Sequence, residues 1–144
     1  GAIPNSIGNL KNLKVLVLNG NMLNGNLPQS LYKLTKLEQL MLTSNNLTGR
    51  LDNDLSNLTN LKVLNLFDNK IDGEFPLAVL KLNNLKELNL SNNSLYGAVP
   101  KELNKMKNLT SIAIAQNNFD TNTDALAYDT NGKSVTQNTI ASNE

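Results

Sequence analysis

Apolar and polar positions repeat along the chain with a period of 24 residues. Within each period the pattern reads L-x-x-L-x-L-x-x-N-x-L, and nearly every copy keeps the same residue type in each column. The first three apolar columns hold Leu13, Leu37, Leu61, Leu85 and Leu109, then Leu16, Leu40, Leu64, Leu88 and Ile112, then Leu18, Leu42, Leu66, Leu90 and Ile114. A fixed period of about 20–29 residues with this spacing predicts a solenoid of stacked coils instead of a globular domain.

The alternation inside each L-x-L triplet predicts a short β-strand. In Leu16-Val17-Leu18 the two leucines would point inward and the valine outward. Strands of successive coils would then pair in parallel. The next column of the repeat is pure asparagine: Asn21, Asn45, Asn69, Asn93 and Asn117. We interpret these asparagines as structural, because a buried carboxamide can donate to and accept from the backbone of an adjacent turn.

Glycine and proline columns predict the return path of each coil. A positive φ or a close backbone approach is expected where glycine recurs, at Gly1, Gly25, Gly49, Gly73 and Gly97. Proline suits an extended segment on the back of the coil, and it recurs at Pro4, Pro28, Pro76 and Pro100. Asp52 replaces proline in one copy. We expect that turn to keep its shape because Leu51 still fills the core.

Composition removes several classes of function. The chain has no cysteine and no histidine, which excludes disulfides, zinc–thiolate sites, cysteine nucleophiles and the usual general base of a catalytic triad. Its formal net charge is +1, from 13 basic and 12 acidic residues, so no overall field favours nucleic acid or an anionic membrane. We therefore expect no enzymatic activity, no cofactor, no metal, no nucleic-acid partner and no direct membrane contact.

The complete motif, exemplified by residues 85–100 (LKELNLSNNSLYGAVP), resembles the plant-specific class of leucine-rich repeats. The resemblance covers residues 1 to about 119. This class fills the ectodomains of plant receptor-like kinases, receptor-like proteins and polygalacturonase inhibitors, and it also occurs in some bacterial surface proteins. The resemblance implies an α/β solenoid, a right-handed coil with a parallel β-sheet on the concave face. Short second strands and 3₁₀ turns are expected on the convex side.

The repeat divides the chain into two parts. Residues 1–119 would form four full coils with a partial coil at each end, and residues 120–144 leave the period. We expect the second part to be an irregular cap, with Asn131-Gly132 as a hairpin turn, or else a linker. The chain lacks the cysteine-paired caps of plant ectodomains and begins in mid-repeat, with no leader-like segment. A fragment of a longer protein is favoured; self-association through uncapped ends and a lineage without cysteine caps are the alternatives.

Recognition is expected on the outward residues of the strands, because the repeat leaves these positions free to vary. The candidate ligand-binding residues are Val15, Val17, Asn19, Gln39, Met41, Thr43, Val63, Asn65, Phe67, Glu87, Asn89 and Ser91. Val63 and Phe67, with Met41 and Val17, form an apolar group in polar surroundings, and exposed apolar side chains on a rigid sheet are candidate anchors. Scattered apolar residues without a partner are the alternative.

These features predict a non-catalytic module that binds a protein or peptide ligand on its concave face. By resemblance it would lie outside the cell or at its surface, as part of a larger receptor or surface protein. A structural or adhesive surface spacer is the alternative function.

Charged residues are predicted to separate onto two edges of the solenoid. Nine lysines stand just before a strand or at its start: Lys11, Lys14, Lys33, Lys36, Lys62, Lys81, Lys86, Lys105 and Lys107. The residues Asp52, Asp54, Asp68, Asp72, Glu74, Asp120 and Asp124 follow strands instead. The resulting field would orient a polar or charged ligand. Simple solubilisation by lysine is the alternative.

Three other patterns carry little weight. Residues 68–74 and 120–124 resemble calcium loops only faintly, since Lys70 occupies a ligand position in the first and the second lacks the terminal glutamate. An ice-binding surface would need a ladder of threonines, which the column Asn5, Gln29, Asn53, Leu77 and Lys101 does not supply. Glycosylation sequons matter only in a secreting eukaryote, and they occur at Asn46, Asn57, Asn89, Asn92 and Asn108.

Overall fold

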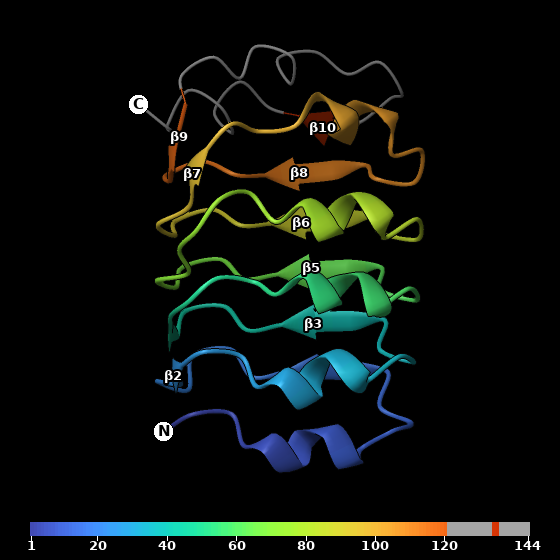
Figure 1. Ribbon diagram of the computed structural model, residues 1–144, viewed down its shortest axis with the longest axis vertical. Helices are drawn as coiled ribbons and strands as arrows, with labels where there is room; N and C mark the ends of the chain where they lie inside the picture. Colours follow the sequence, from blue (N-terminus) through green and yellow to red (C-terminus); the bar gives the residue numbers. More distant parts are fainter. Residues whose placement is uncertain (121–133, 136–144) are drawn as a thin grey trace.

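The computed structural model describes residues 1–120 and 134–135. The chain winds into a right-handed stack of coils, with strands on one side and 3₁₀ helices on the opposite side (Figure 1). Each coil passes through a 3₁₀ helix, crosses to a strand and returns through a turn, which contains glycine in the first four coils. The helical segments of the described residues are all 3₁₀ and none is α-helical. The structure confirms the predicted solenoid.

Six strands form one parallel sheet in the order β1-β3-β5-β6-β8-β10. Their bounds are β1 Val15–Val17, β3 Gln39–Met41, β5 Val63–Asn65, β6 Glu87–Asn89, β8 Ser111–Ala113 and β10 Ser134–Val135. Leu16 is in register with Leu40, and the same row continues through Leu64 and Leu88 to Ile112. Residues that pair across adjacent strands are therefore one sequence period apart, so the inward leucines stack directly on one another.

Short second strands lie in the turns that follow the main strands, as the resemblance implied. Their bounds are β2 Asn24–Gly25, β4 Asn46–Leu47, β7 Tyr96–Gly97 and β9 Asn118–Phe119, and β2 pairs with β4 and β7 with β9. Among the described residues, the third coil contributes only an isolated bridge, between Glu74 and Tyr96. The glycines of these turns have positive φ, 77° at Gly49 and 88° at Gly73, which confirms why glycine recurs there.

A five-residue 3₁₀ helix crosses the back of each coil. The helices are η1 Asn5–Asn9, η2 Gln29–Lys33, η3 Asn53–Asn57, η4 Leu77–Lys81 and η5 Lys101–Lys105. Proline precedes four of them, and Asp52 precedes η3 with nearly the same backbone angles, φ −74° and ψ 153° against −68° and 144° at Pro28. The Asp52 carboxylate also accepts a hydrogen bond from the Asp54 N–H at 2.8 Å. A side-chain cap thus replaces the proline, and the turn keeps its shape as expected.

The core is a continuous column of leucine between the sheet and the 3₁₀ helices. Each described coil after the first buries its repeat leucines completely, for example Leu37, Leu40 and Leu42 in the second coil. Burying one such side chain stabilises the fold by roughly 1.5–3 kcal/mol. In the first coil the equivalent Leu13 and Leu18 are only partly buried.

The asparagine column forms a hydrogen-bonded ladder inside the solenoid. Asn69 is buried, and its Nδ2 donates to the carbonyl oxygens of Leu42 at 2.9 Å and Leu66 at 3.2 Å. Its Oδ1 accepts from the Leu47 N–H at 3.1 Å. Asn45 makes the same set of contacts one coil earlier. The structural role predicted for these carboxamides is confirmed.

A second asparagine row, which the sequence analysis missed, runs along the edge where the chain passes from 3₁₀ helix to strand. Each side-chain amide donates to a backbone carbonyl of the preceding coil: Asn60 to Thr35 at 2.8 Å, Asn84 to Thr59 at 2.9 Å and Asn108 to Asn83 at 2.8 Å. This row fastens consecutive coils on the side remote from the buried ladder.

The predicted hairpin at Asn131-Gly132 and most of the predicted cap lie outside the described residues. Ser134 and Val135 do lie within them and extend the sheet in parallel, opposite Ser111 and Ile112. No helix in the described ranges is long and apolar enough to cross a bilayer.

Candidate ligand-binding face

The sheet face is the surface formed by the outward residues of β1, β3, β5 and β6 and by the residues two positions after each strand. Strand pairing arranges the twelve candidate residues in three rows across this face. The rows are Val15, Gln39, Val63 and Glu87; Val17, Met41, Asn65 and Asn89; and Asn19, Thr43, Phe67 and Ser91. The predicted outward orientation is confirmed for the strand residues, whose central leucines are buried while the flanking residues are not.

The apolar members of this face differ in how much surface they offer. Val15 and Val17 are 47% and 49% exposed, and Phe67 is 38% exposed. Met41 and Val63 are half-buried between neighbouring strands. Since Val17 is in register with Met41, the valines of β1 and Met41 form one apolar patch. Phe67 follows β5 in a different row.

The three candidate asparagines also shape the backbone beside them. Asn65 Oδ1 accepts from the Phe67 N–H at 3.1 Å, and Asn89 Oδ1 accepts from the Ser91 N–H at 3.0 Å. Asn19 Oδ1 instead reaches the next coil and accepts from the Thr43 N–H at 2.8 Å. These carboxamides therefore hold the strand ends that carry the third row, a role that the sequence analysis did not assign to them.

Ser91 does not lie on the accessible surface as predicted. The residue is only 8% exposed. Serine is much shorter than the phenylalanine that stands at the same position one coil earlier, so it does not rise above its neighbours. Ser91 therefore offers a ligand little contact area.

The lysine edge is the edge of the solenoid where the chain passes from 3₁₀ helix to strand, and it carries the nine lysines Lys11, Lys14, Lys33, Lys36, Lys62, Lys81, Lys86, Lys105 and Lys107. In Figure 1 these connections all lie on the right of the molecule, and the turns that contain Asp68, Asp72 and Glu74 lie on the left. The named lysines and these three acidic residues thus lie on opposite edges, as predicted, but Arg50 and Lys70 lie on the same edge as the acidic residues. Lys62 Nζ is 3.2 Å from Glu38 Oε1, so one lysine of the edge is paired.

The described residues contain no group of three or more Asp or Glu side chains placed to hold a metal ion. Residues 120–124, the second of the two calcium-like segments, lie mostly outside them. Four of the five sequon asparagines, Asn46, Asn57, Asn92 and Asn108, are exposed, and Asn89 is half-buried on β6. Asn92 Nδ2 donates to Asp68 Oδ1 at 2.9 Å, so its amide nitrogen already contributes to the fold, as that of Asn108 does.

Residues 1–140 match the family model of a leucine-rich repeat region. No curated protein matches the chain significantly. Among solved structures, the chain is similar to the ectodomain of the Arabidopsis thaliana receptor kinase GASSHO1/SCHENGEN3, solved with CASPARIAN STRIP INTEGRITY FACTOR 2, at 38% identity and a TM-score of 0.77. It is also similar to the Arabidopsis receptor kinase HAESA in complex with the peptide hormone IDA and the co-receptor SERK1, at 33% identity and a TM-score of 0.77.

A third similar structure is a plant ice-binding protein, at 30% identity and a TM-score of 0.77. Each of the three matches covers 82% of this chain, but only 14%, 20% and 38% of the respective relative. The chain thus spans a minor part of each of these proteins. The repeat, the coil geometry and the match over residues 1–140 agree, and the chain belongs to the leucine-rich repeat family.

Proposed function

We propose that this chain recognises a peptide or protein ligand on its sheet face, as the extracellular part of a larger receptor or surface protein. The observation that carries the proposal is the exposure of Val15, Val17 and Phe67 on a rigid sheet whose other outward residues are mostly polar. Exposed apolar side chains on a pre-organised surface are the usual anchors of a protein interface.

The similar receptor ectodomains support this proposal. The receptor kinase HAESA was solved with a peptide hormone and a co-receptor, and the GASSHO1/SCHENGEN3 ectodomain with CASPARIAN STRIP INTEGRITY FACTOR 2. Both proteins are plant receptor kinases whose leucine-rich repeats form the ectodomain. A peptide ligand and an extracellular position for this chain rest on that likeness together with the apolar anchors of its own sheet face.

The variation along the rows favours recognition of one ligand over binding to ice. An ice surface is periodic, so a protein that binds it needs a regular array of like side chains. The third row instead reads Asn19, Thr43, Phe67, Ser91. Such variation from coil to coil suits a ligand whose own side chains differ along its length.

The proposal can be tested by selecting peptides from a displayed random library on the immobilised chain. Affinities of the selected peptides are then measured for the wild type, for Phe67→Ala and for Leu77→Ala. Leu77 is a matched control, since it is an exposed apolar residue on η4, opposite the sheet. Phe67→Ala should weaken binding by about tenfold or more and Leu77→Ala should not. An unchanged affinity for Phe67→Ala, or an equal loss at Leu77, contradicts the proposal.

A further inference from the structure

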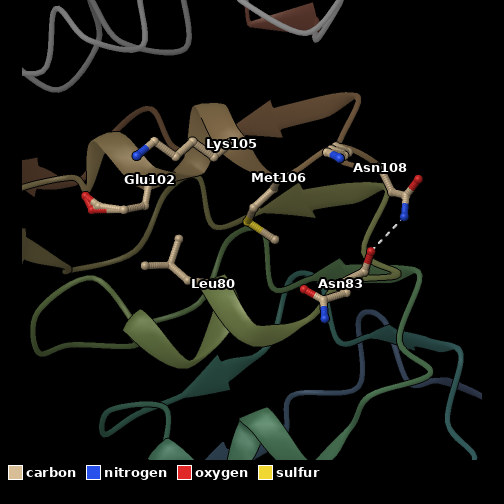
Figure 2. Close-up of a pocket in the computed structure, with 7 residues that line it drawn as sticks. Leu80, Asn83, Glu102, Lys105, Met106 and Asn108 are labelled. Carbon is tan, nitrogen blue, oxygen red and sulfur yellow. Dashed lines mark hydrogen bonds between the residues drawn. The ribbon is translucent and has the colours of Figure 1, made fainter.

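A groove of about 510 Å³ lies between η4 and η5, away from the sheet face. Leu80 on η4 and Met106, the residue that follows η5, face each other across it (Figure 2). Both side chains are partly buried and packed against the core. They give the groove an apolar floor that remains open to solvent.

The corresponding space between η1, η2 and η3 is filled, although a hollow of about 420 Å³ also lies beside Leu10 and Lys11 in the first coil. Tyr32 is the fourth residue of η2 as Leu80 is of η4. Tyr32 is buried, and its hydroxyl accepts a hydrogen bond from the Asp52 N–H at 3.2 Å, so it fills the space next to η3. At the other end of the solenoid η1 and η2 are in such close contact that a Cβ on Gly8 would come within 2.6 Å of Ser30 Cβ. Leu80 is shorter than tyrosine and has no hydroxyl, and the gap above it stays open.

The charges around the groove are mainly positive. Lys105 and Lys107 line it, while Glu102 is its one acidic lining residue. Lys81, at the end of η4, lies on the same lysine edge. Within the described part of the chain the single ion pair joins Lys62 and Glu38. The ammonium groups of Lys105 and Lys107 therefore have no carboxylate partner among the described residues.

One wall of the groove is braced by the second asparagine row. Asn108 Nδ2 donates to the Asn83 carbonyl oxygen at 2.8 Å and joins the two coils (Figure 2). The side-chain carboxamide of Asn83 is exposed and carries two donors and an acceptor. Such a group can bond the backbone of a peptide that lies along the wall.

We propose that this groove binds an acidic peptide segment of a partner protein, separately from the ligand of the sheet face. One apolar side chain of the segment would lie between Leu80 and Met106, and flanking carboxylates would bind Lys105 and Lys107. The lysines favour a negatively charged segment by charge complementarity, and the apolar floor favours a segment that carries an apolar anchor residue. The lining contains no arginine and no aromatic residue, the side chains that stack on bases and read nucleic acid. A protein segment therefore fits better than an oligonucleotide.

The test uses a fluorescein-labelled peptide of glutamates with one central leucine, titrated with the full chain and followed by fluorescence anisotropy. A second peptide carries serine in place of the leucine. We expect the serine peptide to bind about tenfold more weakly, because an apolar side chain no longer enters the groove. Equal binding of the two peptides, or no binding of the leucine peptide, would overturn the proposal.

Three variants locate the site. The double variant Lys105→Glu/Lys107→Glu should lose about tenfold in affinity, and Lys33→Glu/Lys36→Glu, on the second coil of the same lysine edge, less than about twofold. Leu80→Tyr should also block the peptide, by filling the gap as Tyr32 does, and circular dichroism reports whether it is folded. Equal losses for the two lysine pairs would show diffuse attraction and refute the site. Equal competition by a charge-matched oligonucleotide would refute the peptide partner.

Discussion

Asn69 Oδ1 accepts a hydrogen bond from the backbone N–H of Leu47 at 3.1 Å, and so joins two turns that are 22 residues apart in sequence. The amide nitrogen of the same side chain bonds the carbonyls of Leu42 and Leu66. One buried carboxamide thus satisfies backbone groups of two coils. No apolar residue of similar size can do so.

Replacing Asn69 by leucine should destabilise the chain by about 1–3 kcal/mol, because buried N–H and C=O groups lose their partners. Asn57→Leu is the matched control, since Asn57 is exposed at the end of η3. The free energy of unfolding is measured by urea titration, followed by far-ultraviolet circular dichroism. Similar losses for the two variants would contradict the assignment of Asn69 to a structural ladder.

The repeat allowed most of the fold to be predicted, because residues of one column occupy equivalent positions in successive coils and share one environment. A leucine at one position could be core or surface, but four leucines and an isoleucine at equivalent positions, from Leu16 to Ile112, indicate a single inward row. The asparagine ladder was predictable for the same reason. So was the η3 turn, where Leu51 kept its place although Asp52 replaced proline.

The features that were missed depend on distances between coils and between side chains, which the repeat pattern does not determine. The row of Asn60, Asn84 and Asn108 is interrupted by Lys36 in the second coil, which bonds Asn12 instead, so it did not stand out as a structural column. The groove above Leu80 depends on how far η5 lies from η4, and Ser91 is covered because of the lengths of its neighbours. Those relations require coordinates.

Gly73→Ala should cost more stability than Gly20→Ala. Both glycines have positive φ, 88° and 66°, which costs an alanine about 1–2 kcal/mol. A Cβ on Gly20 meets nothing within 4 Å, whereas one on Gly73 would lie 2.8 Å from Arg50 Cβ. Thermal unfolding of the two variants measures the difference. Adding Arg50→Gly to Gly73→Ala should recover part of the loss, and a failure to recover any would exclude the Arg50 contact as its cause.

Tyr32 should make the chain lose stability at alkaline pH. Burial raises the pKa of this phenol above its usual value near 10.0, and the hydrogen bond from the Asp52 N–H opposes the shift only partly. The unfolded chain therefore ionises at lower pH than the folded one. The stabilisation linked to the protonated Tyr32 phenol is fully present below pH 10 and is lost as pH rises through the folded pKa.

Unfolding free energies of wild type and Tyr32→Phe are compared from neutral to alkaline pH. The difference between them should change above about pH 10, and a constant difference would contradict this.

Self-association through the first coil is the last prediction. Leu10 is 50% exposed, whereas its equivalent in the second coil, Leu34, is fully buried, and Met22 in the first coil is 78% exposed. Among the described residues β1 is the terminal strand of the sheet, so the backbone groups on its outer side, next to Val15 and Val17, have no strand partner there. We expect this chain of 144 residues to associate as its concentration rises.

The double variant Leu10→Lys/Met22→Lys should reduce that association because it places charge on the contact surface. Leu77→Lys is the control, since Leu77 is 59% exposed but lies on η4. Sedimentation velocity over a concentration series measures the mass. A monomer at every concentration, or an equal effect of Leu77→Lys, would rule out the first coil as the contact.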